Sequence, residues 1–169
     1  MGAYARAVRG AEAGVIAAAT VELSFFVLDL VRLHPLATPV VLSGALPGPG
    51  GVMLDLTSAS GVAAGLWATY QVVVLTLVHF LTFGFVGVVV SLMFDWRQPF
   101  EAGRVLLLAG LCTAAFFATV ALSGSVVAIG TVGWPAVLAT NLLAAVVLGG
   151  ALRLVSLDVT ESVEAKPNG

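Results

Sequence analysis

The feature that most constrains this chain is a long apolar segment between Trp67 and Trp96. From Trp67 to Phe94 its only acidic or basic side chain is His79, which lies near the centre. A run of about 20 apolar residues is enough to cross the hydrocarbon core of a bilayer. Tryptophan is enriched at membrane interfaces, so the two flanking rings fit the ends of a span. The segment therefore predicts a membrane-spanning helix with one ionisable group at mid-depth, which is a functional candidate by default.

The composition of the whole chain agrees with a membrane protein. It is 60% hydrophobic and only 9% charged, whereas soluble domains carry roughly 25% charged residues. Lipid offers no hydrogen-bond partner to the backbone, so spanning segments of this kind must be helical. The net charge is −2 and no basic cluster occurs, which indicates no nucleic-acid partner. We expect an all-α, polytopic membrane protein whose first partner is the lipid bilayer.

The apolar runs predict one membrane domain over residues 1–155, built as a four-transmembrane-helix bundle, and a polar cytoplasmic tail over 156–169. Thr38-Pro39 is typical of a helix start and predicts a short interfacial helix to Leu46, between the first two spans. Pro47 to Gly51 would end it. The predicted spans are about 11–31, 61–94, 105–127 and 135–154.

The placement of arginine and lysine predicts the orientation. If the N-terminus is cytoplasmic, only Arg32 lies on the outer side, and the six others are inside. Those six are Arg6, Arg9, Arg97, Arg104, Arg153 and Lys166. This predicts a multi-pass protein of the cell (bacterial inner) membrane with both termini in the cytoplasm.

Polar residues near the middle of each span predict a buried polar core. Glu22 and His79 occupy the middle of the first two spans, and Thr113 and Asn141 the middle of the last two. We expect Glu22 and His79 to meet, with Asn141 and Thr113 as secondary partners. A neutral Glu22 donating to His79 and an ion pair are both open, because desolvation favours the first and attraction the second. The pair would be a structural clasp, a proton relay or substrate site, or a cofactor ligand.

A second polar cluster lies at the outer end of the first span. Asp29 and Arg32 are three residues apart, one helical turn, and His34 follows. This spacing predicts an ion pair with a snorkelling arginine; a substrate-recognising cluster is the alternative. A helical stripe that carries all three acids of the span is expected to face protein. Its members are Glu12, Val15, Ala19, Glu22, Phe26 and Asp29.

Motifs for chemistry are few. The sequence has no nucleophile elbow, phosphate-binding loop or HExxH motif, so we predict no catalytic residues. One imidazole and one carboxylate are too few for a closed metal site. No cofactor is required, and His79 is the only mid-membrane candidate ligand for a haem or chlorophyll-type group.

These observations predict a small, non-catalytic accessory or structural subunit of a larger membrane complex, with respiratory or photosynthetic electron transfer as one setting. Its partners would be other membrane subunits or copies of itself. The first alternative is a small proton-coupled transporter or channel that uses Glu22 and His79. The second is a single-histidine haem or chlorophyll-type cofactor carrier.

Overall fold

The computed structural model describes residues 2–34, 37–43, 57–94, 96, 101–122 and 129–164. All regular structure in these ranges is helical. The helices are α1 (Ala3–Val31), α2 (Ala37–Leu42), α3 (Ala59–Met93), α4 (Ala102–Leu122), α5 (Ile129–Val132) and α6 (Trp134–Glu164).

Four of these helices are long and apolar enough to cross a membrane. They are α1, α3, α4 and the part of α6 from Trp134 to Leu154. The prediction of an all-α chain with four spanning helices is confirmed. The physical reason is general: apolar segments of this length can satisfy their backbone groups in oil only as helices.

The helix bounds differ from the sequence prediction at several ends. The first helix begins at Ala3, well before the expected start near residue 11, because its alanine-rich opening has strong helix propensity. The last helix continues to Glu164, through residues that were expected to form a polar tail. A short helix, α5, lies between the last two spans, where no helix was predicted. The ends of two predicted elements, residues 44–46 and 123–127, lie outside the described part of the chain.

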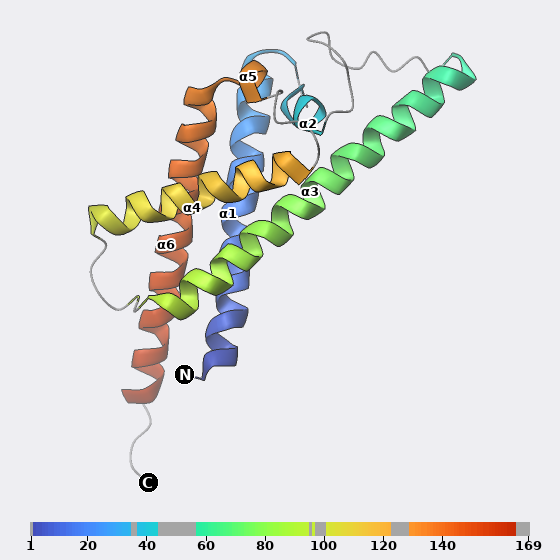
Figure 1. Cartoon of the computed structure of the whole chain (residues 1–169). Coiled ribbons are helices and arrows are strands. Elements are labelled where there is room, and N and C mark those ends of the chain that lie inside the picture. Colours follow the sequence, from blue (N-terminus) through green and yellow to red (C-terminus); the bar gives the residue numbers. More distant parts are fainter. Residues whose placement is uncertain are drawn as a thin grey trace.

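The helices are arranged around α1. It runs antiparallel to α6, side by side, so that the start of α1 and the end of α6 lie at the same end of the molecule (Figure 1). The most extensive contact joins α1 to α3, followed by the contacts of α6 with α4 and with α1. In Figure 1, α4 crosses α1 and α6 steeply, and the beginning of α3 extends away from the other helices.

Glycine makes the contact between α1 and α3. A Cβ atom added to Gly10, Gly14 or Gly87 would come within 3.0 Å of the facing helix, and for each of them backbone is among the atoms it meets. Small residues allow this close approach, which favours association of helices in lipid. At the same contact the Ser91 hydroxyl donates to the backbone carbonyl of Arg6 at 3.0 Å. The backbones of α1 and α3 therefore approach each other closely at this contact.

The face of α1 that points inward is not the predicted acidic stripe. Glu12 is exposed, and Val15 and Phe26 are 43% and 39% exposed. Only Asp29 of that stripe is buried, and Glu22 is half-buried. The buried face consists mainly of small residues: Gly10, Ala13, Gly14, Ala17, Ala18, Val21, Phe25 and Asp29. The stripe prediction was wrong because close packing of small residues, rather than shielding of acids, orients this helix.

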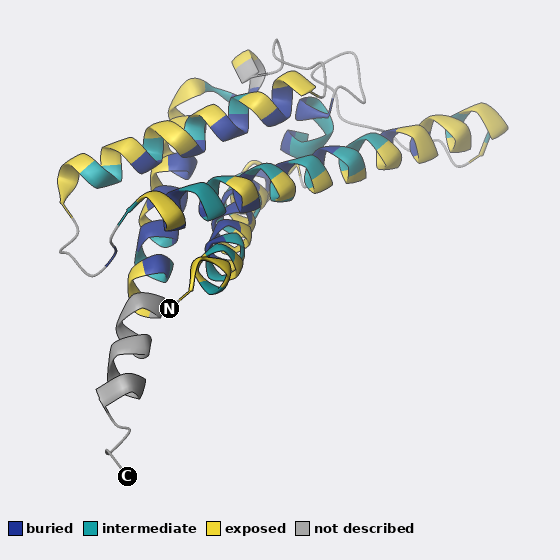
Figure 2. Ribbon diagram, turned by 60° about the horizontal axis from the view of Figure 1, so that its bottom comes forward, coloured by how far each residue is buried: buried dark blue, intermediate teal, exposed yellow. Residues whose placement is uncertain are grey.

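Burial is uneven along α3. In Figure 2 buried positions concentrate where α3 passes α1 and α4, and its opening turns are mostly exposed. Trp67 and Tyr70 stack on each other there, with ring centroids 5.5 Å apart. Trp96, at the other end of the predicted span, is 6% exposed, and its indole N–H donates to the Val90 carbonyl at 3.3 Å.

Candidate functional site

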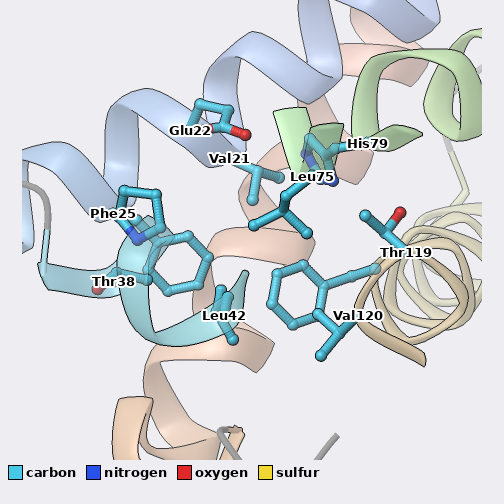
Figure 3. Close-up of a pocket in the computed structure, with 11 residues that line it drawn as sticks. Val21, Glu22, Phe25, Thr38, Leu42, Leu75, His79, Thr119 and Val120 are labelled. Atoms are coloured by element: carbon cyan, nitrogen blue, oxygen red, sulfur yellow. The ribbon is translucent and has the colours of Figure 1, made fainter. Parts of the chain in front are cut away.

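A small cavity lies where α1, α2, α3 and α4 meet. The space open to the centres of water molecules is about 20 Å³, which is room for about one water. Figure 3 shows its lining side chains, which are largely apolar. The lining residues are Val21, Glu22, Phe25, Thr38, Pro39, Leu42, Leu75, His79, Phe116, Thr119 and Val120.

His79 is the most deeply buried ionisable side chain of this cavity. It is 3% exposed and lies close to the backbone of Ala18 on α1. Its Nε2 atom is buried and has no hydrogen-bond partner among the described residues. The ring lies 4.5 Å from the Phe83 ring, centroid to centroid. The imidazole is therefore enclosed between α1 and the aromatic ring of Phe83.

Glu22 reaches the same cavity from α1. It is half-buried, and in Figure 3 its carboxyl group is turned toward the imidazole of His79. Nε2 of His79 has no partner among the described residues, Glu22 included, so the carboxyl group does not bond to it directly. The structure therefore places Glu22 and His79 around one cavity, as two separate polar groups.

The two predicted secondary partners do not line the cavity. Thr113 is half-buried elsewhere on α4. Asn141 is 0% exposed on α6, where its amide nitrogen donates to the Val137 carbonyl at 2.8 Å. Its Oδ1 atom has no partner among the described residues.

Thr119, which was not among the predicted site residues, lines the cavity from α4. It is 1% exposed and donates to the Ala115 carbonyl of its own helix at 3.0 Å. The available signal was its spacing of seven residues, two turns, from Cys112, which is also buried. Thr113 was predicted from the sequence because it lies near the middle of its span. That prediction missed Thr119, because α4 crosses its neighbours steeply and the middle of the span does not face the cavity (Figure 1).

The outer polar cluster is organised around Thr38 rather than Arg32. Asp29 is 1% exposed, and its two oxygens accept from the Thr38 backbone N–H and from the Thr38 hydroxyl, each at 2.7 Å. Arg32 and His34 are exposed. The predicted ion pair of Asp29 with Arg32 was wrong. The carboxyl group instead binds an N–H in the first turn of α2 and holds that helix over the cavity.

The geometry limits which groups this cavity could hold. Among the residues that the structure describes, no three His, Cys, Asp or Glu side chains gather into a metal site. A space of about 20 Å³ admits a water-sized molecule but no macrocycle. His79 as placed therefore does not fit the axial ligand of a haem or chlorophyll-type group.

No protein-family model matches this chain, and no curated protein or solved structure shows significant similarity to it. What the fold supports is a class: four apolar helices fit a small, multi-pass integral membrane protein.

Proposed function

We propose that this protein is a non-catalytic subunit of a larger membrane assembly, in which the outer half of α3 packs against helices of other subunits. The observation that carries the proposal is the extension of α3 beyond the rest of the molecule (Figure 1). The helix has 35 residues, a length of roughly 52 Å at 1.5 Å per residue. That exceeds the roughly 30 Å of a hydrocarbon core.

The surface of this extension favours a protein partner. Leu66, Trp67 and Tyr70 are 68%, 59% and 57% exposed. If the two aromatic rings lie at the interface, as such rings prefer, the turns before them project past the hydrocarbon. A few helical turns without tertiary contacts are only marginally stable in water. Packing against another subunit would stabilise them.

The proposal is tested by photocrosslinking in native membranes, with a photoreactive residue at position 66 or, as a control, at position 106. Leu106 is similarly exposed, at 69%, on α4. We expect position 66 to crosslink to a protein that co-purifies at fixed stoichiometry after gentle solubilisation, and position 106 to crosslink mainly to lipid. Crosslinks to lipid alone from position 66, with the chain purified as a monomer, would contradict the proposal.

A second candidate function is proton-coupled transport, favoured by the placement of Glu22 and His79 around one cavity. Paired ionisable groups at mid-membrane are typical of proton relays. The test is proton flux into liposomes that contain the purified protein, followed with an internal pH-sensitive dye. We expect flux in the wild type and its loss in Glu22→Gln. Equal flux in wild type, variant and empty liposomes would contradict this function.

A further inference from the structure

We propose that α2 is a movable lid over the cavity between α1, α2, α3 and α4. The hydrogen bonds between Asp29 and Thr38 hold this lid closed, and its hinge is Leu33. Opening of the lid admits water to the cavity, where Glu22 is half-buried. The inference concerns access to the cavity and does not depend on the subunit function.

The first observation is the position of α2. It lies near the end of α1 (Figure 1), in contact with α1, α3 and α5. Thr38, Pro39 and Leu42 of this helix line the cavity. Figure 3 shows Thr38 and Leu42 on one side of the cavity and His79 on the other. The helix therefore covers the side of the cavity that lies away from His79.

The second observation is the attachment of α2. The helix has six residues, and a helix this short has little stability of its own. The Thr38 backbone N–H and hydroxyl both donate to the carboxyl group of Asp29, each at 2.7 Å, and so join α2 to α1. One carboxyl group thus carries both bonds, and losing it releases both at once.

The third observation is a strained residue between α1 and α2. Leu33 has a φ of 60°, in the left-handed region that a residue with a Cβ atom adopts at a cost in free energy. The N–H of Leu33 bonds to the Leu30 carbonyl at 3.0 Å, and the N–H of His34 to the Asp29 carbonyl at 2.9 Å. This pattern ends many helices, with glycine as the usual residue at the left-handed position. The Leu33 side chain is 84% exposed, so its burial does not offset the cost.

These two features act in opposite directions on α2. The bonds of Thr38 to Asp29 hold α2 over the cavity, whereas a change of Leu33 to an ordinary φ would relieve strain and swing α2 away. Strained residues persist only where the surrounding structure holds them, and they are found in switch regions. A short helix that one carboxyl group holds against backbone strain should open more readily than the long helices around it.

The test is the reactivity of a cysteine placed under the lid, in the full-length protein in detergent micelles. Val120 is 1% exposed on α4 and lines the cavity. It is replaced by cysteine in a Cys112→Ala background, and the reaction with a charged, water-soluble thiol reagent is followed by mass spectrometry. Native Cys112 is 0% exposed on the same helix and lies outside the lining. Its reaction rate in the otherwise unchanged chain reports general unfolding.

Asp29→Ala should release the lid. We expect the cysteine at position 120 to react at least about fivefold faster in this variant, because the two bonds that hold α2 are lost. The rate at Cys112 should stay low. An acceleration at Cys112 that equals the one at position 120 would show general unfolding and would overturn the proposal. An unchanged rate at position 120 would overturn it as well.

Leu33→Gly tests the hinge in the opposite direction. Glycine adopts a positive φ without steric cost, so this change should favour the closed position and slow the reaction at position 120 by roughly threefold or more. Loss of stability cannot produce a slower reaction. Leu33→Ala is the matched control, because alanine keeps the Cβ atom that causes the strain, and its rate should equal that of the wild type. Equal rates in the two variants, or a faster reaction in Leu33→Gly, would overturn the proposal.

Discussion

The carboxyl group of Asp29 on α1 accepts two hydrogen bonds from Thr38 on α2, one from the backbone N–H and one from the hydroxyl, each at 2.7 Å. The two residues are nine positions apart in the chain, and both side chains are buried. A carboxyl group from one helix thus satisfies an N–H group in the first turn of another, which a side chain of that helix would ordinarily do. The contact positions α2, whose Thr38, Pro39 and Leu42 close one side of the Glu22–His79 cavity.

Replacing Asp29 should therefore destabilise the fold, and replacing Arg32 should not. In Asp29→Ala two buried donors of Thr38 lose their acceptor, and an unpaired buried group costs roughly 1–3 kcal/mol. Arg32 is exposed, so Arg32→Gln is the matched control and should change stability by less than about 0.5 kcal/mol. Denaturant unfolding in detergent micelles measures both. Equal losses in the two variants would instead support an Asp29–Arg32 pair.

Adding one methyl group between α1 and α3 should weaken their contact. In Gly14→Ala and in Gly87→Ala the new Cβ would meet backbone of the facing helix within 3.0 Å. Backbone cannot move aside as a flexible side chain can, so each change should cost about 1–3 kcal/mol. The control is Gly110→Ala on α4, where nothing lies within 4 Å of an added Cβ. Unfolding in micelles should find the control unchanged or slightly more stable, since alanine favours helix over glycine.

The hydrogen bond of Ser91 should contribute less than the glycine contact beside it. Its hydroxyl lies 3.0 Å from the Arg6 carbonyl and 2.8 Å from the Val88 carbonyl of its own helix. Bonds between membrane helices average about 0.6 kcal/mol, so Ser91→Ala should cost well under the loss in Gly14→Ala. The same unfolding measurement compares them. A larger loss in the serine variant would show that polar contact, not packing, joins α1 to α3.

The orientation in the membrane can be tested with single cysteines. The native Cys112 is buried and is first replaced by alanine. If arginine and lysine concentrate on the cytoplasmic side, Gly2→Cys should be protected from a membrane-impermeant thiol reagent in intact cells, and Ser60→Cys should be labelled. Both positions are exposed, so each thiol is accessible once its side is reached. The reverse labelling pattern would place both termini outside.

Some features of the cavity were predictable from residue type and position. His79 and Glu22 stand out because ionisable groups are rare in long apolar segments, and the structure places both on the lining. Their partners were not predictable in the same way. Thr119 rather than Thr113 lines the cavity, and His79 lies close to the backbone of Ala18, which no side-chain pattern can indicate.

The amino-acid sequence by itself determined that the chain is all-α with four helices able to span a membrane. The reason is that the hydrocarbon core of a bilayer offers no hydrogen-bond partners, so apolar segments of this length pair their backbone groups within a helix. Tertiary structure decided how each helix is rotated and how steeply it crosses its neighbours. Gly10 and Gly14 are four residues apart, a spacing that indicates close helix packing. The acidic stripe of the same helix, however, predicted a different inward face. The rotation and crossing angle of a helix depend on contacts between residues that are distant in the sequence. In this structure those contacts make Thr38 the hydrogen-bond partner of Asp29. They also place the small residues of α1 on its buried face.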